Sequence, residues 1–259
     1  MGVLDRFRLD GKRALVSGGS RGLGRAMALA LAEAGADVIL TGRTEATLAA
    51  AADEVRARGV QAWTIVADMG SPAACEAACA RALDECAPID ILVNNVGGRL
   101  ENVPIEAEPL ATWQRLIDHN LTSCFVATKL IGGAMLARGG GRVINIASIS
   151  AMIANRGIAG RHYETAKAAV LHFTRCAAAD WAPHGVTVNA ICPGLFMTDA
   201  NRRWSRERPE VIEAHVRNVP MGRAGEPDEI GPLAVYLASP AASYVTGAAF
   251  VIDGGYTLW

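Results

Sequence analysis

The chain has no excess of charge of either sign and no cluster of basic residues. Its 259 residues carry 25 Lys and Arg against 26 Asp and Glu, a formal net charge of -1. Proteins that bind a phosphate backbone or an anionic membrane present concentrated Lys and Arg. We therefore expect no nucleic-acid partner.

The sequence also lacks a long apolar run. Its first ten residues, MGVLDRFRLD, contain no apolar segment typical of a secretory leader. No uninterrupted apolar stretch approaches the roughly 20 residues that span a bilayer. We therefore expect a cytoplasmic protein with no membrane contact.

Cysteine occurs six times but never as Cys-x-x-Cys, and no histidine stands at metal-ligand spacing from one. Cys75, Cys79 and Cys86 are spaced as one face of a helix. We interpret them as small apolar core residues in a reducing compartment, and we expect no metal site.

Short β-branched or apolar runs alternate with Ala- and Leu-rich stretches of helical period. The predicted strands are 13–17, 38–41, 61–66, 89–93, 142–147, 186–191 and 248–252. Strands that alternate with helices pair in parallel through right-handed crossovers. The pattern predicts an α/β fold, a Rossmann-type doubly wound parallel sheet of about seven strands with helices on both faces.

The alternation runs through the chain without a Pro-, Gly- or Ser-rich linker or an internal repeat, so residues 1–259 are expected to form a single domain. Residues 199–223 are rich in Arg and Glu and interrupt the rhythm. We interpret them as a flexible excursion near the ligand site that serves as a substrate lid.

A glycine-rich turn follows the first predicted strand. Residues 17–24 read SGGSRGLG and lead into a helical stretch. Gly18, Gly22 and Gly24 allow the backbone to turn sharply and to approach a pyrophosphate, while the free N–H groups of the helix face the phosphates. This pattern predicts a dinucleotide site.

Tyr163 and Lys167 stand four residues apart in a stretch of helical period, so they share one helix face. A free tyrosine, with a pKa near 10, is too weak a base at pH 7. An ammonium about 4 Å away attracts the phenolate by on the order of 4 kcal/mol at an effective dielectric near 20, before desolvation. We therefore expect the pKa of Tyr163 to lie closer to neutrality.

Several motifs together resemble the short-chain dehydrogenase/reductase family over nearly the whole chain. They are the GxxxGxG spacing, NNVG at 94–97, HNLTSCF, VINIAS, the YETAK stretch, PGLFMT and VIDGG. The resemblance implies a catalytic tetrad of Asn120, Ser148, Tyr163 and Lys167. Tyr163 would exchange the substrate proton, Lys167 would also hold the nicotinamide ribose, Ser148 would bond the substrate oxygen, and Asn120 would support a proton-relaying water.

Two residues are candidates for the catalytic serine. In most relatives it lies 13 residues before the tyrosine, which selects Ser150, whereas the end of the strand selects Ser148. We favour Ser148, because the strand end fixes its position in space and a loop absorbs two extra residues easily.

The resemblance also implies the cofactor-binding residues. They are Ser17, Gly18, Ser20, Arg21, Gly22, Leu23, Gly24, Arg43, Asp68, Met69, Asn95, Val96, Gly97, Tyr163, Lys167, Pro193, Gly194 and Thr198. NAD-specific members carry an acid at the end of the second strand, where this chain has Gly42 and then Arg43. Because Arg21 and Arg43 can meet a 2′-phosphate, NADP(H) is favoured, with NAD(H) as the alternative.

The resemblance is strongest to the group that contains 3-oxoacyl-carrier-protein reductases and gluconate or polyol dehydrogenases. The former meet an acidic carrier with arginines at two positions that are Gly139 and His184 here. Arg138 and Arg142 lie near enough to substitute for them.

A second set of basic residues surrounds the tyrosine in sequence. Arg99, Arg156 and Arg161, with His162, would favour a sugar acid or keto acid if they ring the mouth of the site. The alternative is that the arginines are ordinary surface residues and that His162 faces solvent or a subunit contact.

These observations predict an NADP(H)-preferring oxidoreductase that interconverts a secondary alcohol and a ketone, with a 3-oxoacyl thioester or a sugar or keto acid as substrate. A polyol or ketose dehydrogenase and a catalytically silent NADPH-binding sensor are the alternatives. The resemblance also implies a homotetramer, with the C-terminal Leu258 and Trp259 buried at a subunit contact.

Overall fold

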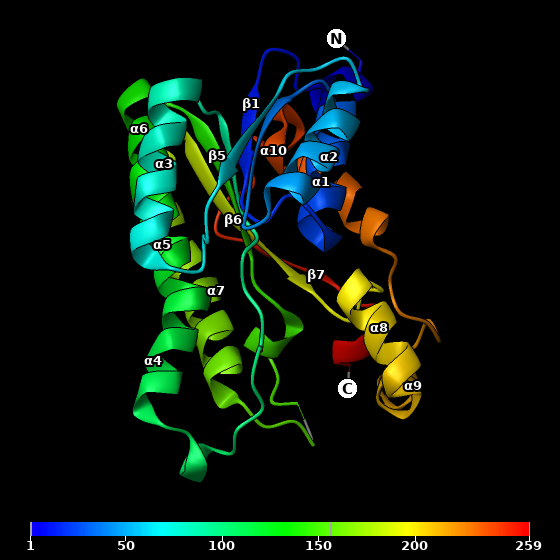
Figure 1. The fold of residues 1–259 in the computed structure, drawn as a ribbon. Helices are drawn as coiled ribbons and strands as arrows, with labels where there is room; N and C mark the ends of the chain where they lie inside the picture. The colour runs from blue at the N-terminus through cyan, green and yellow to red at the C-terminus, as the bar shows by residue number, and fades with distance from the viewer. Residues whose placement is uncertain (1, 156, 259) are drawn as a thin grey trace.

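Seven parallel strands form one sheet at the centre of the protein (Figure 1). The computed structural model describes residues 2–155 and 157–258. The strands are β1 (Arg13–Val16), β2 (Asp37–Gly42), β3 (Ala62–Val66), β4 (Ile91–Asn94), β5 (Gly141–Ile146), β6 (Val186–Pro193) and β7 (Ala249–Ile252). Their order, β3-β2-β1-β4-β5-β6-β7, reverses direction between β1 and β4. The predicted doubly wound sheet is confirmed.

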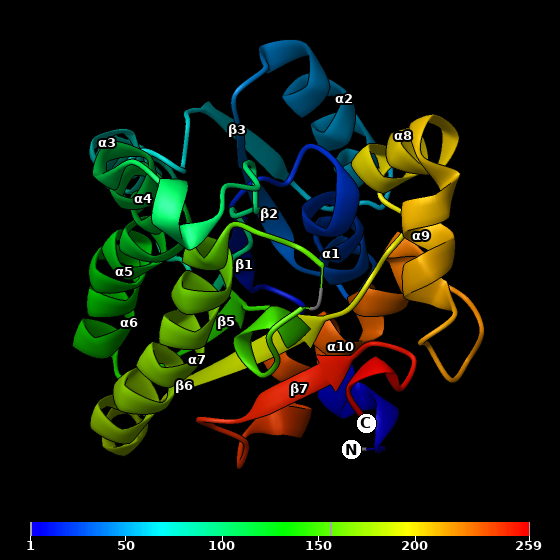
Figure 2. The same cartoon turned by 90° about the horizontal axis from the view of Figure 1, so that it is seen from below.

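Helices cover both faces of the sheet (Figure 2). One layer contains α1 (Gly22–Glu33), α2 (Glu45–Arg56) and α10 (Gly231–Ala238). The other contains α3 (Pro72–Cys86), α4 (Leu110–Ile117), α5 (Ser123–Ala127), α6 (Gly133–Arg138) and α7 (Arg161–Trp181). The strands inside the sheet are therefore buried from both sides, which explains their nearly continuous apolar runs, whereas the edge strands β3 and β7 are partly exposed.

Alternate residues of the strands pack into two hydrophobic cores, one on each face of the sheet. Val16 and Leu40 face the α1 side, whereas Leu15 and Ile39 face the α3 side. The three cysteines of α3 are buried in the second core, as their helical spacing predicted.

The helical run Leu110–Arg138 is long and apolar enough, by length and composition alone, to cross a membrane. Charged residues interrupt this segment, so the sequence shows no continuous apolar run there. Leu116, Ile131 and Met135 of this run are fully buried against the rest of the protein. Part of the run therefore packs in the core, as the helices of proteins without a membrane span also do.

The segment 199–223 is not the irregular excursion that the sequence predicted. It contains two helices, α8 (Asp199–Glu207) and α9 (Pro209–Val216). The Thr198 hydroxyl accepts a hydrogen bond from the Asn201 amide at 3.4 Å and caps α8, and Pro209 occupies the first turn of α9. The Thr198 cap and Pro209 favour helices here, although the polar composition of the segment had suggested a loop.

A buried polar network joins the centre of the sheet to the helices behind it. Asn94 Nδ2 donates to Thr128 Oγ1 and to Asn145 Oδ1, both at 2.9 Å, and Asn145 Nδ2 donates to Thr174 Oγ1 at 2.9 Å. Asn94 and Asn145 are direct neighbours on β4 and β5. The network fixes the end of the sheet from which the loops after β4 and β5 depart.

Replacing Asn145 should destabilise the protein. Asn145→Ala leaves the Asn94 amide with one partner fewer in a buried site and opens a small cavity, so we expect a loss of about 2 kcal/mol in the free energy of unfolding. Chemical denaturation measures it. The matched control is Thr41→Val, because the buried Thr41 hydroxyl has no partner among the described residues. An equal loss in both variants would contradict the role of the network.

Candidate active site

The glycine-rich turn packs against the loop that follows β4. Ser17 Oγ accepts hydrogen bonds from the amides of Asn95 at 2.9 Å and Val96 at 3.1 Å. A Cβ atom at Gly24 would lie 2.3 Å from Gly18 O and 2.5 Å from Asn95 Nδ2. Only glycine fits there, so the start of α1 lies directly under the turn and presents bare backbone.

A cleft of about 1060 Å³ opens beside this turn. It crosses the carboxyl ends of β1, β2 and β4, where the strand order reverses, the usual place for a ligand in such sheets. Its walls include the following predicted cofactor residues: Gly18, Ser20, Arg21, Arg43, Asp68, Met69, Asn95, Val96 and Gly97. Met69 belongs mainly to the core beneath the cleft.

The other predicted cofactor residues lie around the cleft without lining it. Leu23 packs on the core from the first turn of α1. Pro193 ends β6, and Gly194 donates its amide to Ile252 O at 2.9 Å. Gly22 opens α1, and its Cα faces Thr198, whose Cγ2 would lie 3.5 Å from a Cβ there.

Gly97 joins the cleft to the residues of the predicted tetrad. A Cβ at Gly97 would lie 2.7 Å from Lys167 Nζ and 2.8 Å from Asn120 Oδ1. Asn120 sits in a π-helical turn at 118–122, the kind of irregularity that is frequent at functional sites. Its side chain accepts from the Gly98 amide at 2.8 Å and donates to Gly98 O at 3.0 Å and Leu116 O at 2.9 Å. Asn120 thus ties this helix to the loop after β4.

Ser148 and Ser150 have different surroundings. Ser148 lies two residues after the end of β5, and its hydroxyl acts to lower the pKa of Tyr163 against the larger effect of burial. Its Oγ accepts from the Ser150 amide at 3.0 Å, whereas Ser150 Oγ accepts from Asn155 Nδ2 at 2.9 Å. Of the two serines, Ser148 is the one whose hydroxyl acts on the pKa of Tyr163, whereas Ser150 binds Asn155.

The electrostatics of Tyr163 differ from the expectation. Burial raises the pKa of Tyr163, and the Ser148 hydroxyl and the charge of Arg99 oppose the rise. Lys167 Nζ lies 5.8 Å from the centre of the Tyr163 ring and donates to Ile146 O at 2.7 Å. Burial lowers the pKa of Lys167 itself to about 8. Desolvation therefore has the largest effect on the pKa of both side chains in the free protein, and the expectation from the sequence did not include it.

The basic residues near Tyr163 do not form an open ring. Arg99 donates to Ala159 O at 2.9 Å and pairs with Glu164, and Arg161 Nη1 lies 2.5 Å from the same carboxylate. His162 does not face solvent or a subunit contact. It is fully buried, with Nδ1 2.5 Å from Glu108 Oε1. Arg156 lies outside the described residues.

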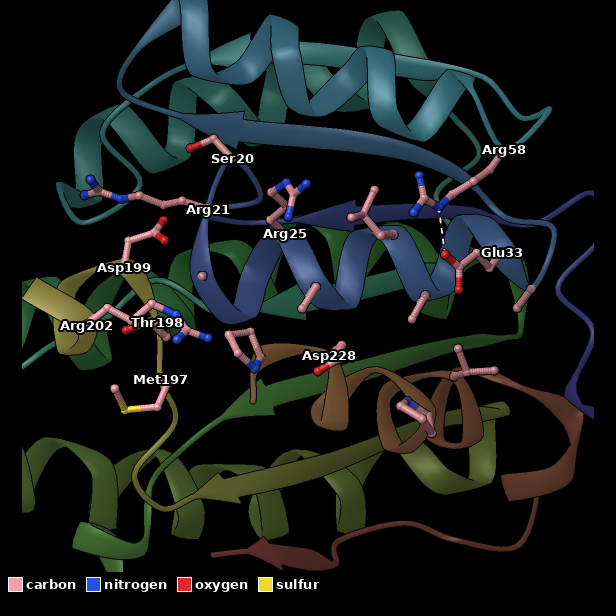
Figure 3. A pocket seen from close by; sticks show the side chains of 18 of the residues that line it. Ser20, Arg21, Arg25, Glu33, Arg58, Met197, Thr198, Asp199, Arg202 and Asp228 are labelled. Carbon is pink, nitrogen blue, oxygen red and sulfur yellow. Dashed lines mark hydrogen bonds and ion pairs between the residues drawn. The ribbon is translucent and has the colours of Figure 1, made fainter. Parts of the chain in front are cut away.

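A second cavity, of about 1110 Å³, opens on the other side of the start of α1. Figure 3 shows Thr198, Asp199 and Arg202 at one end of it, and the Arg58–Glu33 ion pair at the other. It shares Ser20 and Arg21 with the cleft, but no member of the predicted tetrad lines it. The tetrad residues do not line the first cleft either, but its wall residue Gly97 lies against Lys167 and Asn120, so the first cleft adjoins the predicted tetrad.

Sequence reasoning missed several residues of the site. Glu164 and Asn155 are buried and bind each other at 2.9 Å, and Glu108 pairs with His162. His119 lines the cleft near Asp68, and burial lowers its pKa. Only the position of His119 next to Asn120 gave a signal in the sequence.

Comparison with known proteins gives extensive matches. Residues 18–257 match the sequence profile of a family described as Enoyl-(Acyl carrier protein) reductase. A galactitol 2-dehydrogenase (L-tagatose-forming) of Cereibacter sphaeroides is 44% identical over 253 residues, 98% of either chain. A 3-oxoacyl-[acyl-carrier-protein] reductase of Synechocystis is 37% identical over 97% of this chain and 99% of its own.

The solved structures agree. A gluconate 5-dehydrogenase of Burkholderia cenocepacia, crystallised with NADP and tartrate, has a TM-score of 0.91 and 36% identity, with 100% of both chains covered. A likeness that extends over the full sheet and over nearly every residue of these relatives means that the chain belongs to the short-chain dehydrogenase/reductase family of NAD(P)-dependent oxidoreductases, which act on alcohol and carbonyl groups.

Proposed function

We propose that the protein is an NADP(H)-preferring dehydrogenase that interconverts a secondary alcohol of an uncharged polyol and the corresponding ketose. The observation that carries the substrate class is the pairing of Arg99 and Arg161 with Glu164 beside Tyr163. Guanidinium groups held in this way are not free to bind a substrate carboxylate. The 44% identity to a galactitol 2-dehydrogenase supports the same class.

The cleft has the features that a dinucleotide phosphate requires. The close packing of Gly18 and Gly24 leaves bare backbone at the positive end of α1, which favours a pyrophosphate. Arg21 and Arg43 line the cleft and form no ion pair within the described chain, so they are available for a 2′-phosphate. When bound there, the nicotinamide supplies or accepts the hydride.

The chain's own residues handle the proton. Tyr163 Oη exchanges it with the substrate oxygen, and the neighbouring Ser148 hydroxyl donates a hydrogen bond to that oxygen as charge develops on it. Lys167 uses one donor on Ile146 O, which leaves two N–H groups for cofactor hydroxyls while its charge stabilises the phenolate. Asn120 holds the loop at Gly98 in place.

An acyl-carrier substrate finds less support. Arg138 donates to Ile89 O at 2.7 Å and lies 3.8 Å from Asp90, and Arg142 is half-buried. Neither offers the free surface charge that an acidic carrier protein would need.

We further propose that residues 1–259 work as one catalytic domain in which α8 and α9 form the substrate lid. Arg202 of α8 pairs with Glu226, and the His215 ring of α9 stacks on Tyr256 at 4.2 Å. These contacts hold the two helices near Thr198, at the edge of the site.

The assembly is proposed to be a homotetramer in the cytoplasm. All six cysteines are free thiols, as is usual in a reducing compartment. Val251 on the edge strand β7, Leu258 beyond it and Phe125 on α5 are exposed apolar side chains of the single chain, typical of subunit contacts. Trp259 lies outside the described residues.

The function is tested with a substrate panel. The panel contains a hexitol and its ketose, a 5-keto sugar acid and an acetoacetyl thioester, each assayed with both nicotinamide cofactors. We expect kcat/KM to be highest for the uncharged pair, and Tyr163→Phe to lower kcat by about 10²–10⁴-fold because the proton donor is lost. Preference for the sugar acid or the thioester would refute the substrate class, and an active Tyr163→Phe enzyme would refute the mechanism.

Cofactor preference is tested at Arg43. Arg43→Ala removes a charged partner of the 2′-phosphate, so Kd for NADPH should rise by about 10-fold or more while Kd for NADH stays within about twofold. Fluorescence titration measures both. The matched control is Arg25→Ala, because Arg25 stands on α1 outside the cleft and is paired with Glu54. Parallel weakening of both cofactors by Arg43→Ala would disprove the assignment.

The buried charge of Lys167 predicts a pH-dependent stability. Because burial lowers its pKa to about 8, the unfolded chain binds more protons than the folded one between about pH 8 and 10.4. The stability of the wild type relative to Lys167→Met should therefore rise with pH across that window, by on the order of 3 kcal/mol. Denaturation at several pH values measures the difference. Lys167→Met should lose activity at every pH, and a pH-independent difference in stability would contradict the shift.

A further inference from the structure

Arg99 occupies a defined place against the proposed catalytic tyrosine. Its guanidinium carbon lies 4.9 Å from the centre of the Tyr163 ring, closer than the 5.8 Å of Lys167 Nζ. A guanidinium within about 6 Å of an aromatic ring is attracted to its face. The side chain is 18% exposed, so solvent screens its charge only in part.

The guanidinium is held in this place from the start of α7. Nη1 donates to Ala159 O at 2.9 Å and to Gly160 O at 3.1 Å, and Nη2 lies 3.5 Å from Glu164 Oε1. Glu164 receives a much closer contact from Arg161, at 2.5 Å. Two guanidinium groups share one carboxylate, so a positive charge remains uncompensated beside Tyr163.

The backbone that follows Arg99 is strained at Leu100. Leu100, the next residue, has φ +54°, the one positive φ outside glycine in the described chain. The Glu101 amide donates to Arg99 O at 2.5 Å, which closes a classic γ-turn, a rare and strained conformation. Strained residues persist where the surrounding structure fixes them, and they cluster at functional sites.

A buried histidine fixes the turn. His162 Nε2 lies 3.0 Å from Arg99 O, and because a carbonyl only accepts, this nitrogen is the donor. His162 Nδ1 lies 2.5 Å from Glu108 Oε1, and both side chains are almost fully buried. The residue next to Tyr163 in sequence thus clamps the residue that covers its ring.

We propose that Arg99 is a positioning residue that holds a fixed positive charge over the Tyr163 ring and, together with Lys167, favours the phenolate form used in catalysis. The inference rests on the proposed acid–base role of Tyr163. The charge of Arg99 acts in the same direction on the pKa of Tyr163, which it lowers against the effect of burial. The groups that face the phenol or its ring are Lys167, Arg99, the Ser148 hydroxyl and the Cys192 thiol of β6, with Glu164 and Arg161 beside them.

Arg99→Met tests the proposal, because it removes the charge and retains an apolar stem that covers the ring. The matched control is Arg161→Met, which takes the other cation from Glu164 without uncovering the ring. Arg99→Lys restores the charge without the forked contacts. If Arg99→Met does not fold, Arg99→Gln replaces it, since its amide still donates to a backbone carbonyl.

Two measurements report on the phenol. The first is the ultraviolet absorbance titration of the phenolate in the free protein, with Tyr163 isolated by difference against the same protein carrying Tyr163→Phe. The second is the pH profile of kcat/KM for alcohol oxidation. We expect Arg99→Met to shift both midpoints upward by about 0.5–1 pH unit, with a loss of turnover at pH 7 of about 3–10-fold that recovers at high pH. Arg161→Met should shift neither midpoint, and Arg99→Lys should restore most of the shift.

Unchanged midpoints in Arg99→Met would overturn the proposal, as would a rise in KM alone, which would make Arg99 a substrate-binding residue. An upward shift of the same size in Arg161→Met would also overturn it, because the effect would then come through Glu164. An active Tyr163→Phe enzyme would refute the proposed function instead, while the absorbance titration would still report whether Arg99 acts on the phenol.

Discussion

The ammonium group of Lys167 is buried, and the arrangement of the active site depends on how that charge is accommodated. Its Nζ has a backbone acceptor in Ile146 O, and no carboxylate pairs with it in the described part of the chain. A buried charge is costly unless it is paired, and this cost appears in the lowered pKa of Lys167. A carboxylate partner would relieve the cost but would also cancel the charge that the proposed mechanism requires beside Tyr163. The site therefore retains a destabilising feature that serves its chemistry.

The topology of the sheet brings the other groups to this charge. Ser17 and Asn95 come directly after β1 and β4, and Ser148 lies two residues after β5. These three strands are neighbours in the sheet. The Asn94–Asn145 contact locks β4 to β5 below them. Glycine then determines how closely the loops approach, since any side chain at Gly97 would displace Lys167 or Asn120. Positions set by strands and packed loops are more precise than positions on free loops.

The features that were predictable from the sequence are those that depend on near neighbours along the chain. The strands follow from the alternation of apolar runs, the glycine-rich turn from its glycines, and the Tyr163–Lys167 pair from helical spacing. Features that depend on distant partners were not predictable. Nothing local indicates that His162 is buried against Glu108, 54 residues away, or that Arg99 and Arg161 share Glu164. The rise in the pKa of Tyr163 was missed for the same reason, because desolvation depends on the whole packed environment.

The balance of charges around Tyr163 connects cofactor binding with substrate choice. Lys167, Arg99 and Arg161 bring three positive charges, and Glu164 contributes one negative charge within direct contact of two of them. The surplus favours both the phenolate and an anionic dinucleotide in the adjoining cleft. Each guanidinium is nevertheless fixed by protein acceptors, so the positive field acts without offering a bidentate site for a carboxylate substrate. Under the proposed function, this arrangement suits a substrate that carries hydroxyl groups and no charge.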